Sequence, residues 1–262
     1  MAGRPYVLCE VPLKASRSVQ YEVAVLPWGA TEPHNLHLPF GTDSLQVEAV
    51  AIEASRLAWE SNTKVVVLPT IALGANAQQL DTSMTLNLRP STQAAILRDV
   101  VESLEYHGVP KLLVLNGHGG NDFRQMIREL QAEAAVFLCS SNWYGIADSR
   151  AFFEAPGDHA GELETSVMLH LVPELVLPLD EAGSGDANVF RVRGLRDGTA
   201  WAPRQWRHVT KDTGVGDPRA ASAEKGRRFF EAVTRTLGDF LVDLASADLN
   251  DMYESGATGP DI

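Results

Sequence analysis

Short, continuous apolar stretches recur along the first half of the chain, and proline, asparagine or serine follows each of them closely. They occupy residues 23–26, 65–68, 112–115 and 136–138. Their apolar residues are contiguous and do not alternate with polar ones, which is typical of strands buried on both faces of a parallel sheet. We therefore predict four buried β-strands at these positions.

Helical patterns separate the predicted strands. Between residues 47 and 58, apolar side chains recur at spacings of three and four, which marks one face of a helix. We predict further helices at residues 92–106, 122–132, 162–171 and 218–244. Because strands and helices alternate, we expect one doubly wound α/β domain over residues 1–262. Residues 173–198 are expected to be mostly irregular, and the tail from about residue 248 to be loosely held.

The composition is that of an ordinary globular protein, and the charge limits the partners to be expected. Of 262 residues, 45% are hydrophobic and 21% are charged, which permits a sizeable core. The 22 basic and 34 acidic residues give a net charge of −12, which repels nucleic acid and anionic membrane surfaces. The sequence shows neither the apolar stretch of a signal peptide nor a run approaching the roughly 18 residues of a membrane span. We therefore expect a cytoplasmic protein with no nucleic-acid or membrane partner.

Polar clusters follow the first, third and fourth predicted strands, at residues 29–43, 116–121 and 158–166. Ligands of open α/β sheets bind outside the carboxyl ends of the strands, so these clusters are expected to meet. Carboxylates and imidazoles without thiolates suit zinc, manganese or ferrous iron. Five such groups exceed one tetrahedral site, and we expect two divalent metal ions roughly 3.5–4 Å apart. The five candidate ligands are Glu32, His34, Asp43, His118 and Glu162.

Each candidate ligand also has a structural interpretation. Asp43 precedes a predicted helix, with Gln46 three positions on, so it resembles an N-cap with a capping-box partner. His118 lies between glycines that can simply form a tight turn. Glu162 and Glu164 point to nearly opposite faces of a helix, so one of them is expected to be structural, and either can complement the helix dipole.

Four motifs, in order from about residue 23 to residue 226, resemble the signatures of the creatininase (creatinine amidohydrolase) family. They are LPWGATEPH with HLP and GTD at residues 26–43, NGHGGN at 116–121, HAGELETS at 159–166, and GVGDP at 214–218 running on to AEKG at 223–226. The resemblance implies a three-layer αβα fold with a mainly parallel central sheet. It also implies a binuclear metal centre and a ring-shaped homo-oligomer, typically a hexamer.

The resemblance also implies roles for the candidate ligands. By motif position, Glu32 and His118 would hold one metal ion, His34 and Glu162 the other, and Asp43 would bridge them. Zinc is the metal we expect first, with manganese and ferrous iron as alternatives.

Catalytic roles are implied for His159 and Glu162. His159 would stand beside the substrate and pass a proton to the leaving nitrogen, while a water that bridges the metals attacks the carbonyl carbon. Residues expected to contact the substrate are His37, Asn116, Gly119 and Trp143.

Departures from the family pattern limit the resemblance. Creatininases carry a Tyr-Glu pair where this chain has Gly119 and Gly120, and Glu162 is interpreted as the replacement ligand. This pattern looks more like relatives that include formamide hydrolases of flavin and deazaflavin biosynthesis and a peptide-processing member of mycofactocin maturation. Near residue 78 the family often has an acid-His pair, whereas here Gln78 and Gln79 follow Ala77, which predicts the loss of a polar substrate contact.

Later aromatic and arginine residues have two interpretations. Trp143, Tyr144, Trp201 and Trp206 can close over a planar ligand or pack in the core. Arg191, Arg193 and Arg204 can bind a carboxylate or phosphate, although solvated arginines are the default.

We therefore expect a metal-dependent amidohydrolase that cleaves a non-peptide C–N bond, of cyclic amide or formamide type, in a small molecule. One alternative is a metal-dependent lyase or isomerase of a carbonyl substrate, in which His159 moves a proton and the metals stabilise an enolate. Another alternative is a non-catalytic metal-binding scaffold, because a fold alone does not guarantee an activity.

Overall fold

The computed structural model describes residues 3–155 and 157–254. Four parallel strands lie in the order β2-β1-β3-β4 within this part of the chain. They are β1 (Val23–Trp28), β2 (Val65–Val67), β3 (Lys111–Asn116) and β4 (Phe137–Asn142). Val25 pairs with Val67 on one side and with Leu113 on the other. The four predicted strands are confirmed, and all residues of β1, β2 and β3 are buried, as their contiguous apolar sequences predict.

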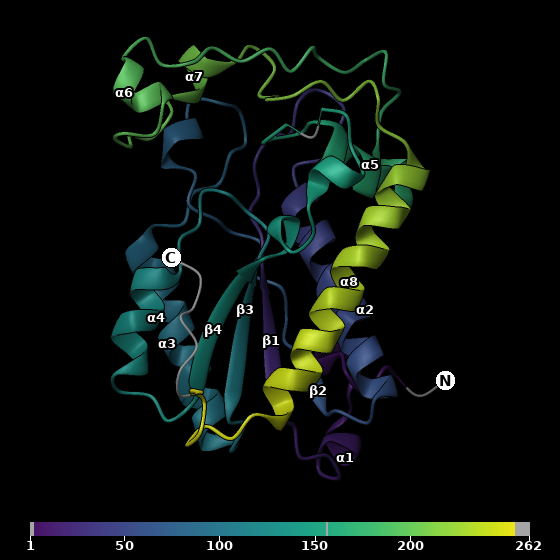
Figure 1. Cartoon of the computed structure of the whole chain (residues 1–262), viewed down its shortest axis with the longest axis vertical. Helices are drawn as coiled ribbons and strands as arrows, with labels where there is room; N and C mark the ends of the chain where they lie inside the picture. The colour runs from purple at the N-terminus through teal and green to yellow at the C-terminus, as the bar shows by residue number, and fades with distance from the viewer. Residues whose placement is uncertain (1–2, 156, 255–262) are drawn as a thin grey trace.

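Helices cover both faces of the sheet (Figure 1). The long ones are α2 (Thr42–Glu60), α3 (Pro90–Tyr106), α4 (Arg124–Gln131), α5 (Glu162–Leu171) and α8 (Ala223–Ser246). Successive residues of β1 point to opposite faces, so Val23 and Val25 pack with α2, α5 and α8, while Ala24 and Leu26 pack with α3 and α4. The result is the three-layer αβα arrangement.

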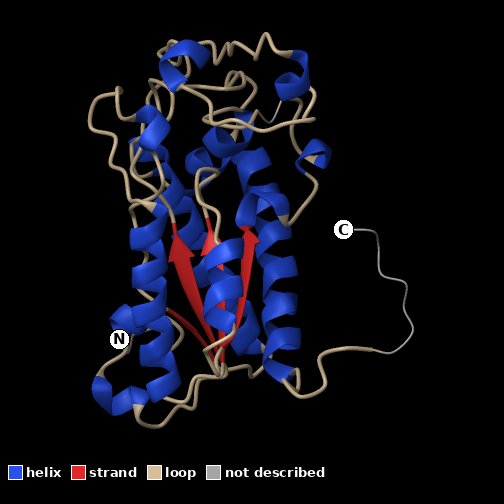
Figure 2. Cartoon of the chain, turned by 90° about the vertical axis from the view of Figure 1, so that its left-hand side faces the viewer, coloured by secondary structure: helices blue, strands red, loops and turns tan. Residues whose placement is uncertain are grey.

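Short helices complete the described chain. They are η1 (Leu8–Glu10), α1 (Leu13–Ser16), η2 (Ala77–Gln79), η3 (Trp143–Gly145), η4 (Ser149–Ala151), η5 (Pro173–Leu175), α6 (Arg193–Arg196) and α7 (Trp206–Val209). Two long segments of largely irregular structure, residues 68–89 and 176–222, lie beyond the carboxyl ends of the strands and form an upper lobe with α6 and α7 (Figure 2). The predicted irregular stretch is confirmed. No helix in the described residues is long and apolar enough to cross a membrane.

Helices α3 and α4 begin within two residues of the predicted positions, whereas the starts of α2 and α8 differ from the sequence predictions in their caps. Helix α2 begins at Thr42 with Gly41 as its N-cap, so the prediction that Asp43 is an N-cap is wrong. Gln46 is no capping-box partner, since its Nε2 donates to the carbonyl oxygen of Glu164 at 2.9 Å. Helix α8 begins at Ala223 and not at residue 218, because Ser222 Oγ accepts a hydrogen bond from the Lys225 amide at 3.3 Å and caps the helix there.

The far end of α8 contacts the start of β3. Lys111 is only 4% exposed, and its Nζ donates to the carbonyl oxygens of Leu244, Ala245 and Ala247 at 2.7, 2.8 and 2.7 Å. These carbonyls are among those that a helix leaves without an internal partner, so the ammonium group satisfies them. Residues 255–262 of the predicted tail lie outside the described residues.

Candidate metal centre and cleft

The candidate ligands meet where β1 and β3 end side by side. Trp28 and Asn116 are paired at the ends of these strands, and the chain leaves the sheet just after each of them. Glu32 and His34 lie on the loop after β1, and His118 lies two residues beyond β3. The first turn of α2 and the first turn of α5 contribute the remaining side chains. The expectation that the polar clusters meet at one edge of the sheet is confirmed.

Two groups of possible metal ligands share Asp43. In the first, His118 Nδ1 lies 2.8 Å from Glu32 Oε1 and 3.1 Å from Asp43 Oδ2. In the second, His34 Nε2 lies 3.0 Å from Asp43 Oδ1 and 4.0 Å from Glu164 Oε1. The two carboxylate oxygens of Asp43 therefore face different histidines, which is the arrangement expected of a bridging ligand.

The chemistry of this donor set fits a divalent cation. Glu32, His34, Asp43 and His118 are at most 5% exposed. Glu32 Oε2 is buried without a hydrogen-bond partner among the described residues. Burying a carboxylate oxygen in this way costs free energy that a bound cation would offset. Oxygen and imidazole ligands in this mixture suit zinc and manganese.

The carboxylates perturb the histidine pKa values strongly. Burial disfavours the charged imidazolium of His34, but Asp43, Glu164 and Glu32 outweigh burial and raise its pKa to about 10. Burial likewise opposes protonation of His118, and Glu32 and Asp43 still raise its pKa well above the usual value. The pKa of Asp43 is lowered, since the two histidines outweigh its burial. Without metal, protons thus occupy the histidine nitrogens.

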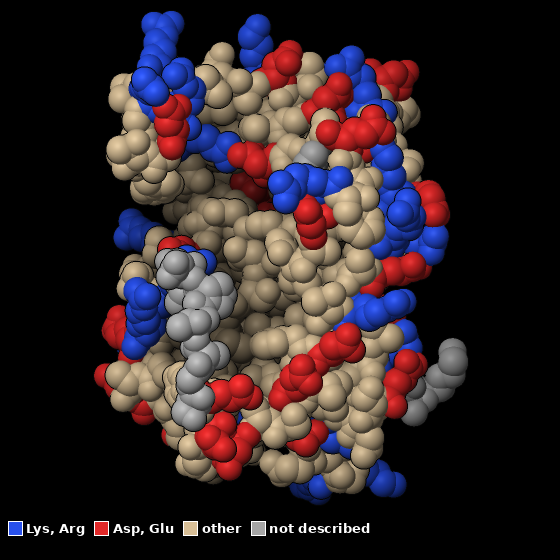
Figure 3. Space-filling view, viewed as in Figure 1, with Lys and Arg blue, Asp and Glu red and all other residues tan. Residues whose placement is uncertain are grey.

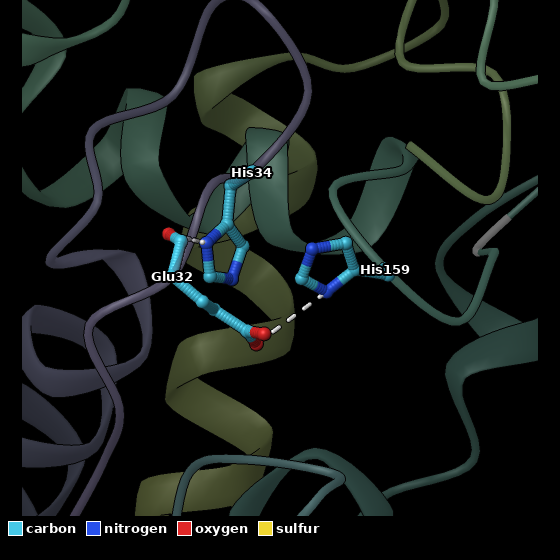
Figure 4. A group of neighbouring side chains, drawn as sticks. All are labelled: Glu32, His34 and His159. Atoms are coloured by element: carbon cyan, nitrogen blue, oxygen red, sulfur yellow. Dashed lines mark hydrogen bonds and ion pairs between the residues drawn. The ribbon is translucent and has the colours of Figure 1, made fainter. Parts of the chain in front are cut away.

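His159 lies beside Glu32 and His34 of this cluster (Figure 4), and its predicted contact with the substrate stays a prediction. Its Nε2 lies 2.9 Å from the carbonyl oxygen of Pro33, and because a carbonyl can only accept, Nε2 carries the proton. The other nitrogen, Nδ1, is 3.9 Å from Glu32 Oε1. The ring packs between His34 and Trp206, with centroid distances of 4.3 and 4.8 Å. The nitrogen Nδ1 therefore faces the candidate metal centre.

Glu162 lies elsewhere, which contradicts its predicted roles as a metal ligand and a catalytic residue. It is fully buried, and its Oε2 accepts hydrogen bonds from the amides of Glu154 and Ala155 at 2.8 and 2.7 Å. Its Oε1 forms an ion pair with Lys225. Since residues two apart on a helix point to nearly opposite faces, Glu164 takes the place near His34.

Three of the four predicted substrate contacts have structural roles instead. Trp143 is 1% exposed and packs in the core against Phe229, with ring centroids 6.1 Å apart. His37 Nε2 bonds to Thr165 Oγ1 at 2.9 Å, and burial lowers the pKa of His37 to about 4. Asn116 Oδ1 accepts the amide hydrogen of His118 at 3.1 Å. Among the described residues that line the cleft above the cluster, none of these three occurs, whereas Gly119 does.

The cleft has a volume of about 1080 Å³. Figure 3 shows it as a hollow beneath the upper lobe, with acidic atoms deep inside and basic side chains on its rim. The described residues that line it include Glu32, Asp43, His118, His159 and Glu164, together with Gln78, Gln79, Arg89, Arg124, Tyr144, Trp201, Arg204 and Trp206. Gln78 and Gln79 both line the cleft, so the segment of residues 75–86 still presents polar side chains there, and the predicted loss of one polar substrate contact stays a prediction.

Asn121 connects the walls of the cleft to the end of β3. Its Oδ1 accepts hydrogen bonds from the Ala75 amide at 3.0 Å and from Gln93 Nε2 at 2.7 Å. Its Nδ2 donates to Asn116 Oδ1 at 3.0 Å. One side-chain amide therefore joins the segment before η2, the first turn of α3 and the strand that precedes His118.

Comparisons with known proteins agree with this architecture. The family model described as Creatininase: Creatinine amidohydrolase matches residues 13–241. A mycofactocin precursor peptide peptidase of Mycobacterium ulcerans is 32% identical over 215 residues, which is 79% of each chain. A crystal structure from Bacteroides fragilis, provisionally named creatinine amidohydrolase, is 43% identical and aligns with a TM-score of 0.89 over 95% of this chain and 99% of its own. A creatininase variant of Zn-Zn type, 22% identical, shares the fold with a TM-score of 0.74 over 93% of this chain and all of its own.

Proposed function

Because the chain belongs to the creatininase family, we propose that it is a metal-dependent hydrolase of an amide-type C–N bond. The observation that carries this proposal is the position of Asp43, whose two carboxylate oxygens face two separate groups of buried ligands. A non-catalytic scaffold would have no need for His159 Nδ1 beside those groups.

Two divalent ions are proposed, with zinc first and manganese as an alternative. Glu32 and His118 would hold one ion, His34 and Glu164 the other, and Asp43 would contact both. The name of one creatininase structure, of Zn-Zn type, supports the choice of two zinc ions. When bound, such ions lower the pKa of water and polarise a carbonyl group.

The surrounding residues supply orientation and proton transfer. The carbonyl oxygen of Glu32 lies 3.0 Å from His34 Nδ1, which fixes the imidazole so that Nε2 faces Asp43. His159 would accept a proton at Nδ1 and return it to the nitrogen of the leaving group. The contact with Trp206 holds the imidazole ring in place. Because His159 is only 7% exposed, little bulk water reaches it.

The scissile bond is proposed first as a non-peptide C–N bond of cyclic amide or formamide type. A second candidate is an amide bond of a short peptide, and two observations favour it. The cleft volume of about 1080 Å³ is at the upper end of small-molecule sites, which leaves room for more than one small ring. The mycobacterial relative is named as a precursor peptide peptidase.

The test combines metal analysis with product analysis. Wild-type protein is compared with Asp43→Asn and with the control Asp99→Asn, an exposed residue of α3. We expect two ions per chain and incorporation of heavy oxygen from labelled water into the product of a cyclic amide, formamide or short peptide. Asp43→Asn should lose both properties, and Asp99→Asn should lose neither. Turnover without solvent oxygen in the product would favour the lyase or isomerase, and a metal-free wild type would favour the scaffold.

A further inference from the structure

We propose that the cleft binds substrates with a free carboxylate group, and that Arg89 and Arg124 bind this carboxylate. The inference rests on the proposed function, because it specifies the class of substrate that enters the same cleft.

Arg89 and Arg124 lie at the starts of two neighbouring helices. Arg89 is the N-cap residue of α3, Arg124 is the first residue of α4, and both line the cleft. The hydrogen bond of 2.7 Å between Gln93 Nε2 and Asn121 Oδ1 joins the first turn of α3 to the loop that enters α4. Figure 1 shows both helices on the same face of the sheet. The two arginines therefore line the cleft from the starts of neighbouring helices.

Arg89 and Arg124 differ from the other cleft arginine, Arg204, in having no carboxylate partner among the described residues. Arg89 and Arg124 are exposed, and neither guanidinium forms an ion pair with a carboxylate in the part of the chain that the structure describes. Arg204, by contrast, is paired with Asp158 at 2.7 Å and stacks on Trp206 at 4.9 Å from the ring centroid. In a chain with a net charge of −12, two guanidinium groups that line one cleft without an ion-pair partner among the described residues favour an anion locally.

Gln79 gives an independent indication of a polar ligand. It is fully buried and lines the same cleft. Both its Nε2 and its Oε1 lack a hydrogen-bond partner among the described residues. Buried amide groups are rarely left unpaired, because each unpaired group costs free energy. A substrate with its own acceptor and donor groups would satisfy the side chain.

A carboxylate is the anion that best fits an amide substrate held in this way. The planar guanidinium group binds a carboxylate through two parallel hydrogen bonds. The cluster around Asp43 lies in the same cleft, so a substrate bound at the wall can present its amide there. N-acylated amino acids and the carboxyl-terminal ends of short peptides contain both an amide bond and a free carboxylate group.

The experiment measures binding by calorimetry to the zinc-loaded protein. The probes are N-acetyl-glycylglycine and its carboxyl-terminal carboxamide, which differ only in the carboxylate. We expect the acid to bind about tenfold tighter than the carboxamide, as one charge-assisted hydrogen-bonded pair would give. This preference should fall in Arg89→Gln and in Arg124→Gln. It should persist in Arg128→Gln, which makes the same charge change at an exposed position of α4 that does not line the cleft.

Three results would overturn the inference: equal binding of acid and carboxamide, no binding of either, or a preference that both arginine substitutions leave unchanged. The last would mean that the metals bind the carboxylate. Hydrolysis of other amides together with any of these results would leave the proposed function standing. An arginine-dependent preference in a protein that hydrolyses no amide would refute the proposed function and support the inference.

Discussion

Substituting the two glutamates of α5 separately distinguishes a structural carboxylate from a metal ligand. Glu162→Gln removes a fully buried charge that accepts two backbone hydrogen bonds and pairs with Lys225. Glu164→Gln removes the carboxylate that lies 4.0 Å from His34 Nε2 and keeps an oxygen for the Ala160 amide. The two changes are chemically identical and only two residues apart, so each is a control for the other.

We expect Glu162→Gln to lose folding stability and Glu164→Gln to lose a bound metal ion. Breaking a buried ion pair costs about 3–5 kcal/mol, but Lys225 is 24% exposed and keeps Glu154 and the Ala220 carbonyl as partners. We therefore expect Glu162→Gln to cost about 2–3 kcal/mol, or roughly 5–10 °C in Tm for a chain of this size. Burial raises the pKa of Glu164 despite the nearby histidines, so its ionised form opposes folding at neutral pH. Removing that charge should leave the Tm of the metal-free protein unchanged or higher.

Thermal unfolding with a chelator and metal analysis without one measure the two effects. Glu162→Gln should keep its metal and unfold at a lower temperature. Glu164→Gln should lose one ion per chain and keep its metal-free Tm. The opposite pattern, with metal lost from Glu162→Gln and retained in Glu164→Gln, would refute the assignment of Glu164 and restore the interpretation based on sequence.

Three further predictions concern the same architecture. Gly120→Ala should lose bound metal, because its Cβ atom would overlap the His118 ring and the Ala75 carbonyl group. At Gly119 a Cβ atom meets open space in the described structure, so Gly119→Ala should keep its metal. Metal analysis of the two variants compares their metal content. Zinc uptake at pH 7 should release protons and weaken as the pH falls, since the pKa of His34 is raised to about 10 in the metal-free protein; calorimetry in buffers of different ionisation enthalpy measures the release. Lys111→Met should lower Tm by roughly 3–10 °C without changing metal content, since three carbonyl groups at the end of α8 lose a partner worth about 1–3 kcal/mol.

The sequence predicted those features that depend on local pattern. Contiguous apolar residues identified all four strands, and the bounds predicted for α5 agree with the structure. Because parallel strands end at one edge, the sequence also predicted that Glu32, His34, Asp43 and His118 would meet.

The choice between Glu162 and Glu164 depended on the rotation of α5, which its sequence does not reveal. All of its first seven residues except Glu164 are buried, so the helix lacks the polar stripe that normally identifies the outward face. Contacts between residues far apart in the sequence could not be predicted from local pattern either. Trp143 packs against Phe229, which is far away in the sequence, and Gln79, Arg89 and Arg124 reach one cleft from separate segments.

The hydrogen bonds of Asn121 have a consequence for anyone who would redesign the cleft. Replacing the whole loop around η2 would remove the Ala75 amide from Asn121 Oδ1, while Asn121 Nδ2 bonds to the same Asn116 oxygen that accepts the His118 amide. A grafted loop would thus disturb the proposed ligand His118 in two ways, through this chain of hydrogen bonds and through loss of the Ala75 carbonyl oxygen, which lies 3.3 Å from His118 Nε2. Loop grafts that begin after Ala75 and vary only residues 77–79 would change the shape of the entrance and leave His118 in place.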